Sequence, residues 1–471
     1  MARRWALSLL TLATLGLTTG NAAAAEDIRI AIGTQDTTIN CATAGPLIRE
    51  LKLLEKYLPK TGKYANAKYE IIWKTFTSGP PVTNEMVANK LDIGMMGDFP
   101  AILNGVTFDR TGNGVPSQYV ATISGSVTGG GNGLVVPLDS PAHSLKDLKG
   151  KQISVPFGSA AHGMLLRAIK DLGWDPEKDV SLVSQSPEIG GTSLKGKKID
   201  GHANFVPFAE LFPFRGFARK IYEGSSVGVP TSHGVIVRSD YAQKYPEIVV
   251  AFLKAMLEAN RLYAEKPEEF SEKMQQWAGI EAEVNYMFHG PLGIQTVDFT
   301  LKPEFVKGLK TALDTLKLIK RAEGDFDVDK WVSDKYIRQA ATELKIDYDK
   351  RLKSYAPLPL TGADALTGRA IEDPKLAGQI WVKGEGKVRG YSTPDSTLAA
   401  IKKLEAEKKD VRVAFVHDRG TGFKLFADKA WYVSGAKSGT AAFLLRGSAE
   451  EWAKTNGGTV VDLAAAKQAV R

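Results

Sequence analysis

A strand–turn–helix pattern at residues 147–173 places the strongest constraint on how this 471-residue chain folds. Ile153 and Val155 form a short apolar run typical of a buried strand, and apolar residues then recur at helical spacing. The turn at Gly158-Ser159 leaves the first N–H groups of the helix unpaired beside the end of the strand. Such a helix start suits a small anion, although a serine in this position is more often only an N-cap.

Strand and helix patterns alternate along the rest of the first half of the chain. Strands are predicted at 28–32, 69–76 and 91–96, and a single helix at 46–58 that ends before Pro59. This alternation predicts an α/β lobe with a parallel core. Ligands of such sheets gather at the carboxyl ends of the strands, so we expect Thr34, Gln35, Asp98 and Ser159 to lie together.

The charge pattern excludes a nucleic-acid binder. The chain carries a formal net charge of +8, two of these charges being Arg3 and Arg4, and it has no Lys/Arg block with interleaved aromatic residues. The histidines at 143, 162, 202, 233, 289 and 417 show no metal-ligand spacing, and Gly129-Gly-Gly131 lacks the context of a nucleotide-binding loop. We expect no metal and no cofactor.

Residues 1–25 have the features of an export signal. Arg3-Arg4 precede a Leu/Ala-rich stretch and a run of small residues, which predicts cleavage before Glu26. No later segment has about 18 uninterrupted apolar residues, so no membrane span is predicted. Cys41 is the only cysteine and lies beyond the cleavage site, which excludes lipid attachment there and an internal disulfide. We expect a periplasmic protein.

Three segments, in order, resemble one family of periplasmic binding proteins. They are the 147–173 pattern, the Gly-Pro turn, helix and "DIG" strand of 76–102, and the segment SPEIGGTSLKGKKIDGHANFVPF at 186–208. The family binds sulfonates, nitrate, bicarbonate and taurine for ABC importers. The resemblance covers about residues 27–355 and implies a type II fold of two α/β lobes joined by a hinge.

The resemblance also implies how the lobes are connected. The Gly-rich segment 128–133 is expected to cross into the second lobe, which would span about 137–230, and Ser232-His233-Gly234 to begin the return. One long helix is predicted at 246–276, and it and the later helices to Leu352 are expected to pack on the first lobe. The lobes would close on a small anion or zwitterion and present it to a membrane permease, with the protein acting as a monomer.

The expected ligand-binding residues follow from the strand ends and the resemblance. Asp98 contacts a ligand amino group or caps the next helix, and His162 and His233 are pocket residues or structural histidines. Asn204-Phe205 stands where sulfonate-binding relatives usually carry Trp. The full expected set is Thr34, Gln35, Gly97, Asp98, Ser124, Ser159, Ala160, His162, Asn204, Phe205 and His233.

A second unit is predicted after the binding domain of residues 26–355. Residues 356–377, rich in Pro and Gly, read as a linker, and 378–471 as a small α+β domain with a capping box at Ser448–Glu451. This domain resembles the copper-carrying accessory lipoproteins of nitrous-oxide reductase (NosL-like). It lacks that family's Cys-containing metal segment and has His417 as its only histidine, which favours a docking or stabilising role over copper transport.

Cys41 supports an alternative from another class of protein. It follows the loop after the first strand, and desulfinases and thiamine-pyrimidine synthases on this fold use Cys or His there. A thiolate near a helix start could be activated as a nucleophile. The sequence lacks the Arg-x-Gly-Gly motif and the Cys-rich run of those enzymes, and a lone cysteine is more often a small buried residue. No catalytic residue is therefore assigned.

Overall fold

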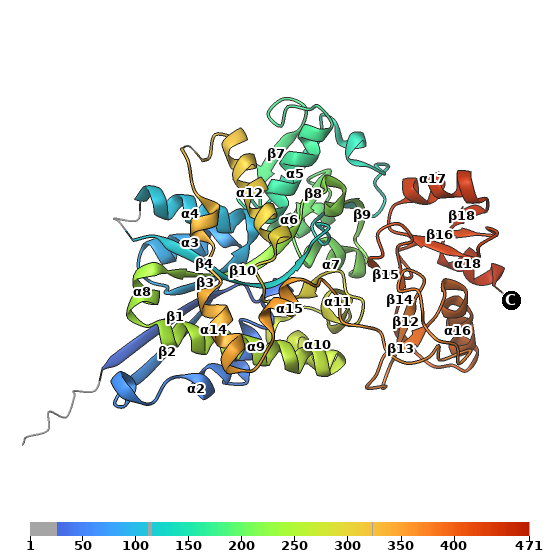
Figure 1. Cartoon of the computed structure of the whole chain (residues 1–471). Helices are drawn as coiled ribbons and strands as arrows, with labels where there is room; N and C mark the ends of the chain where they lie inside the picture. The colour runs from blue at the N-terminus through green and yellow to red at the C-terminus, as the bar shows by residue number, and fades with distance from the viewer. Residues whose placement is uncertain (1–25, 112–114, 323, 471) are drawn as a thin grey trace, which may run out of the picture.

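The computed structural model describes residues 26–111, 115–322 and 324–470. Two sheets, each with helices packed against it, form the larger part of the protein, and two smaller sheets lie at one side of it (Figure 1). The predicted export signal at residues 1–25 lies outside the described residues. Among the residues that are described, no helix is both long and apolar enough to cross a membrane.

The first sheet has six strands in the order β11-β4-β10-β3-β1-β2. β1, β2 and β3 run parallel, while β10 runs antiparallel to both of its neighbours, β3 and β4. Alternate residues of β1 enter different cores, Ile28, Ile30 and Ile32 on one face and Ala31 on the other. The strands are β1 (Asp27–Thr34), β2 (Lys68–Thr75), β3 (Ile93–Gly97), β4 (Ser117–Ser126), β10 (Thr231–Arg238) and β11 (Thr296–Val297).

The second sheet has five strands in the order β7-β6-β8-β5-β9, with β6, β7 and β8 parallel. The chain enters it between β4 and β5 and leaves it between β9 and β10, so two segments connect the lobes. The predicted two-lobed α/β fold is confirmed. The strands are β5 (Gly133–Pro137), β6 (Gln152–Val155), β7 (Ser181–Ser184), β8 (Gly201–Asn204) and β9 (Ala218–Glu223).

Fifteen α-helices lie among the described residues up to 355. They are α1 (Pro46–Glu50), α2 (Leu53–Tyr57), α3 (Gly79–Val87), α4 (Asp98–Thr111), α5 (Ala160–Asp171), α6 (Pro187–Lys195), α7 (Phe208–Phe214), α8 (Ser239–Lys244), α9 (Pro246–Glu265), α10 (Pro267–Ala278), α11 (Ala282–His289), α12 (Pro303–Leu318), α13 (Val328–Trp331), α14 (Lys335–Glu343) and α15 (Tyr348–Leu352). Short 3-10 turns η1 (Ile39–Cys41) and η4 (Gly224–Val227) follow β1 and β9.

Two predicted helices are each divided in the structure. The helix predicted at 46–58 is α1 and α2, separated where Lys52 takes a left-handed conformation, and the break lets both Leu53 and Leu54 enter the core. The helix predicted at 246–276 is α9 and α10. The division falls at Lys266 because Pro267 disfavours a helical conformation in the residue before it and provides no N–H.

The later helices are predicted to pack on the first lobe, but helix α11 departs from this prediction. Its apolar residues join the core of the second sheet and extend it to the C-terminal strands. The Tyr286 ring lies 5.5 Å from the Trp381 ring and 5.8 Å from the Phe415 ring. Burying these large aromatic surfaces against each other stabilises the position of α11 between the second lobe and the C-terminal part.

The C-terminal part contains two antiparallel sheets, β13-β12-β14-β15 and β17-β16-β18. The strands predicted near 411–415, 430–433, 441–445 and 459–461 are present. The predicted capping box is wrong: α17 begins at Arg446, which pairs with Glu450, so Ser448 lies inside the helix. The elements are β12 (Gly378–Val382), β13 (Arg389–Tyr391), α16 (Pro394–Ala406), β14 (Val411–His417), β15 (Lys424–Phe426), β16 (Trp431–Ser434), β17 (Ala441–Phe443), α17 (Arg446–Asn456), β18 (Thr459–Val461) and α18 (Leu463–Ala469).

Candidate ligand-binding site

A narrow cleft lies where the two lobes meet, at the carboxyl ends of β1, β3, β6 and β8. Six of the expected site residues line it, and they come from both lobes. They are Gln35, Gly97, Ser159, Ala160, Phe205 and His233. The free space is only about 20 Å³, room for little more than one water molecule, so the two lobes are closed on each other.

The start of α5 forms one wall of this cleft. Gly158 turns the chain after β6 with φ +76°, a conformation that favours glycine, and Ser159 caps the helix by accepting a hydrogen bond from the His162 N–H at 3.3 Å. The N–H groups of Ala160 and Ala161 have no partner within the helix because they belong to its first turn. The Ser159 hydroxyl still has its own proton to donate, so this wall offers several donors to an anion.

The opposite wall holds buried polar side chains without partners. Thr38 lies just before η1 and is 2% exposed, and Asn40 lies within η1 and is 7% exposed. The Thr38 Oγ1 and Asn40 Oδ1 atoms have no hydrogen-bond partner. Gln35 is fixed there by donating from Nε2 to the Met95 carbonyl at 2.9 Å. Because an unpaired buried polar atom costs about 1–3 kcal/mol, a polar ligand that pairs these atoms would be stabilised.

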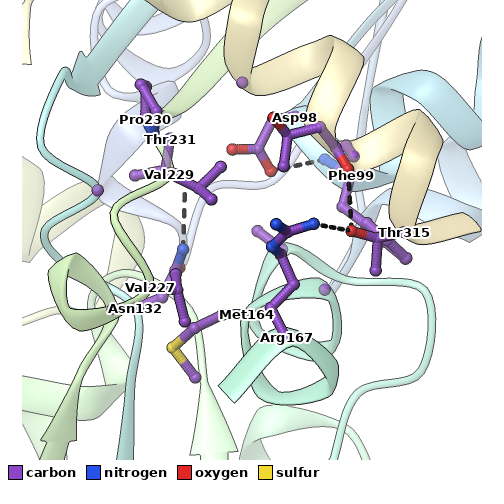
Figure 2. A pocket seen from close by; sticks show the side chains of 17 residues that line it. Asp98, Phe99, Asn132, Met164, Arg167, Val227, Val229, Pro230, Thr231 and Thr315 are labelled. Carbon is purple, nitrogen blue, oxygen red and sulfur yellow. Dashed lines mark hydrogen bonds between the residues drawn. The ribbon is translucent and has the colours of Figure 1, made fainter. Parts of the chain in front are cut away.

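Asp98 lies at the edge of the cleft rather than in its lining. Its carboxylate accepts hydrogen bonds from the Phe99 N–H at 2.6 Å and from the Ser232 N–H at 3.2 Å, which ties the start of α4 to β10. Burial raises the pKa of Asp98, and hydrogen bonds from Thr231, Phe99 and Ser232 act against that rise. These hydrogen bonds are of the kind expected at a helix start, while contact of Asp98 with a ligand stays a prediction. Figure 2 shows Asp98 in the space beside the cleft.

Contacts in that neighbouring space hold the lobes together (Figure 2). Arg167 of α5 donates from Nη1 to Thr315 Oγ1 of α12 at 3.2 Å, and α12 packs on α4 of the first lobe. In the connecting segments, Asn132 Nδ2 donates to Thr231 Oγ1 at 3.4 Å. The Arg167–Thr315 contact crosses from one lobe to the other, and the Asn132–Thr231 contact joins the two connecting segments.

His162 lies behind the cleft. Its Nδ1 accepts a hydrogen bond from the Gly158 N–H at 3.1 Å, and its ring stacks on Phe157 with centroids 4.7 Å apart. Burial, together with the charge of Arg321, lowers the pKa of His162 to about 4, so the ring is neutral at pH 7. In this position the imidazole supports the turn that carries Ser159.

Three further expected residues are also outside the lining. Thr34 and Ser124 are buried in the first sheet, where Ser124 pairs with His233 across β4 and β10. Asn204 is satisfied by its neighbours: its Nδ2 lies 2.7 Å from His202 Nε2, and its Oδ1 accepts from the Phe205 N–H at 2.9 Å. These side chains shape the ends of the strands, and their role in binding stays a prediction.

Cys41 and His233 are in contact, with 3.0 Å between Sγ and Nε2. Burial raises the pKa of Cys41 to about 12 and lowers the pKa of His233 to about 3, so both groups are neutral at pH 7. A neutral thiol beside a neutral imidazole is not an activated nucleophile. The contact is that of a buried core pair, which disfavours the alternative enzyme.

Sequence reasoning missed eight residues that line the cleft: Thr38, Asn40, Gly79, Pro100, Asn132, Val206, Thr231 and Ser232. Thr38 and Asn40 continue the polar loop after the first strand, and Thr231 and Ser232 precede the expected His233, so extending each segment by a few residues would have found them. Within the described part of the chain, no group of three or more His, Cys, Asp or Glu side chains could hold a metal ion.

The fold is that of a two-lobed periplasmic binding protein, and comparisons with known proteins agree with it. Residues 59–279 match the NMT1-like family. The chain is similar to the taurine-binding periplasmic protein of Escherichia coli K12, with 29% identity over 201 residues, or 42% of this chain and 58% of that protein. The similarity thus spans little more than half of that relative's length.

Two solved structures with a similar fold are of binding proteins. The alkanesulfonate-binding protein SsuA from Xanthomonas axonopodis pv. citri, bound to MOPS, has a TM-score of 0.54 and 22% identity and covers 66% of this chain and 99% of its own. The nitrate-binding protein NrtA from Synechocystis PCC 6803 has a TM-score of 0.54 and 14% identity, and the match covers 70% of this chain and 92% of NrtA. At these identities the likeness concerns the fold.

Proposed function

We propose that this chain is the solute-binding component of a periplasmic ABC importer. Its lobes would part to admit a small anionic or zwitterionic solute, since the closed cleft has room for little more than one water molecule. The protein would then deliver the solute to a membrane permease, acting as a monomer and without a cofactor. The observation that carries the proposal is the cleft, in which the open start of α5 faces the lobe that supplies the unpaired Thr38 and Asn40 side chains. The periplasmic relatives named for taurine and alkanesulfonates support it.

The polar atoms of the cleft favour a sulfonate that also carries an amino group. The start of α5 supplies donors to the sulfonate oxygens, with Ser159 and Ala160 nearest to them. Asn40 Oδ1 is an acceptor and needs a donor, which nitrate and a plain alkanesulfonate do not have. Gly97, Phe205 and His233 would enclose the remainder of the solute, with Thr34, Asp98, Ser124, His162 and Asn204 behind them.

A thermal-shift screen of the protein tests this proposal. The solutes are taurine, ethanesulfonate, nitrate, bicarbonate and Cu(I). We expect taurine to raise the unfolding temperature most, because a ligand that binds only the folded state stabilises it by RT ln(1 + [L]/Kd). A shift with nitrate or bicarbonate alone would change the solute class, and no shift with any anion would contradict the proposal.

We propose the following organisation for the chain: export signal 1–25, binding domain 26–355 with a second lobe at about 137–230, linker 356–377 and NosL-like domain 378–471. Residues 356–377 form no helix or strand, only turns and an isolated bridge between Ala363 and Ala370, which supports the proposal that this segment is a linker. His417 is buried and its Nδ1 donates to the Ala377 carbonyl at 2.7 Å. This arrangement supports a docking or stabilising role for the last domain, and Cu(I) should give no shift in the screen.

A further inference from the structure

A second cavity lies between the second lobe and the C-terminal part, away from the cleft. It has a volume of about 250 Å³ and is bounded by α7 and β9 on one side and by residues around β15 and β16 on the other. Figure 1 shows the C-terminal part next to the second lobe, and residues of both share one core. The volume is below the 300–1,000 Å³ usual for drug-sized ligands, so only a small molecule fits.

The walls of this junction cavity are mainly apolar. Aliphatic and aromatic side chains from both sides contribute, among them Leu138, Pro213, Met287, Phe426, Trp431 and Leu444. Aromatic faces in a desolvated setting attract cations as well as apolar groups. The walls therefore suit a ligand with an apolar body.

Three carboxylates line this cavity, Glu210, Asp428 and Asp462, and of these only Glu210 is buried. Glu210 of α7 is 5% exposed and lines the cavity, and its Oε1 accepts a hydrogen bond from Lys220 Nζ. Its other oxygen, Oε2, is buried and has no partner. Since an unpaired buried carboxylate oxygen is costly, a donor from a ligand that reached this atom would be stabilised.

The charges around Glu210 do not balance. Lys220 Nζ also donates to Glu223, so two buried carboxylates share one ammonium group, and Glu223 Oε1 is already used by the Gly131 N–H at 2.9 Å. Burial raises the pKa of Glu210 to about 7; the charge of Lys220 acts against this rise, and the negative charge of Glu223 adds to it. A buried charge needs a counter-charge, and either a proton or a cationic ligand can supply it.

The other charged groups of this cavity already have partners. Arg219 donates to the Ser140 and Ala142 carbonyls at 2.7 and 2.8 Å. Lys429 lies 2.9 Å from Asp428 on the exposed rim, and Asp462 accepts from the Ala465 N–H at 2.9 Å as the cap of α18. Glu210 is therefore the group best placed to receive a ligand charge.

We propose that this junction cavity binds a small primary amine, whose ammonium group donates to Glu210 Oε2 while its apolar body packs against Phe426 and Trp431. The C-terminal part would then serve to complete a second ligand site on the second lobe. This inference is independent of the solute proposed for the cleft, since the two sites share no lining residue.

The test is isothermal titration of the full chain with n-hexylamine, and with n-hexanol as the uncharged probe of the same length. We expect hexylamine to bind at least tenfold more tightly than hexanol at pH 8. Between pH 8 and pH 6 its affinity should fall about tenfold, because protonation of Glu210 removes the counter-charge. Hexanol affinity should not change over this range.

Two variants locate the binding. Glu210→Gln keeps the size of the side chain and removes its charge, so it should lower hexylamine affinity at least tenfold and leave hexanol unchanged. Ala430→Phe fills the cavity and should abolish binding of both probes, whereas the exposed Ala464→Phe should not alter either. If Glu210→Gln does not fold, Ala430→Phe and the comparison of hexylamine with hexanol still test the proposal. Absence of hexylamine binding, or equal binding of amine and alcohol, would overturn the proposal.

Discussion

At the scale of single residues, the environment of a side chain decides its chemistry more than its type does. Cys41 and His233 are the residue types of a nucleophile and its base, but both are buried and neutral. The sequence places Cys41 after the first strand and cannot report that burial. Ser159, by contrast, is recognisable from the sequence, because the strand–turn–helix pattern alone fixes it at the start of α5.

The thiol of Cys41 should be unreactive in the folded protein. The side chain is fully buried and its pKa of about 12 leaves almost no thiolate at pH 8. We expect labelling by a chromogenic aromatic disulfide to take place only after denaturant is added, and Cys41→Ser to retain solute binding. Rapid labelling of the native protein, or loss of a turnover activity in the serine variant, would instead favour the enzyme.

At the scale of elements, the alternating pattern predicts most strands and the parallel core, because periodicity reports burial directly. Periodicity does not report breaks in helices. Pro267 marks the break between α9 and α10 in the sequence. The break between α1 and α2 depends on tertiary packing, because Lys52 adopts a left-handed conformation where the core requires both Leu53 and Leu54. Cleft residues such as Asn132 and Ser232 are missed for a similar reason. They come from the connecting segments, whose position is set only when both lobes are formed.

Helix α5 approaches the first lobe so closely that one methyl group should disturb closure. A Cβ on Gly163 would lie 2.6 Å from Phe99 Cδ2 of α4. We expect Gly163→Ala to increase the radius of gyration in small-angle scattering with solute present and to weaken solute binding at least tenfold. Gly447→Ala, where a Cβ meets nothing within 4 Å, is the matched control and should behave as the wild type. An unchanged radius of gyration and affinity in Gly163→Ala would show that this contact does not govern closure.

At the scale of the whole molecule, buried histidines should make the protein sensitive to acid. Burial lowers the pKa to about 4 in His162, His202, His289 and His417 and to about 3 in His233. Below pH 6.5 the unfolded chain therefore binds more protons than the folded one, so the free energy of unfolding decreases as the pH is lowered. The loss is up to about 1.4 kcal/mol per pH unit for each histidine until its folded pKa is reached.

Two buried carboxyl groups, Glu210 and Asp98, act in the opposite direction, because burial raises the pKa of each. The pKa of Glu210 is raised to about 7, so between pH 7 and its unfolded value the folded chain holds a proton that the unfolded chain lacks, which favours folding at acid pH. Two carboxyl groups against five histidines leave a net loss. Urea unfolding at pH 7.5, 6 and 5 should give a steadily lower free energy of unfolding. Equal or higher stability at pH 5 would contradict the assignment of these histidines as neutral buried groups.

The most direct test of solute capture in the cleft compares two serines that both cap helices. Ser159 caps α5 in the cleft, and Ser186 caps α6, accepting from the Ile189 N–H, outside the cleft lining. By isothermal titration with taurine, Ser159→Ala should weaken binding about tenfold, since one hydrogen-bond donor to the sulfonate is lost. Ser186→Ala loses a similar cap and should bind as the wild type does. Wild-type affinity in both variants would contradict the claim that solute binds at the start of α5.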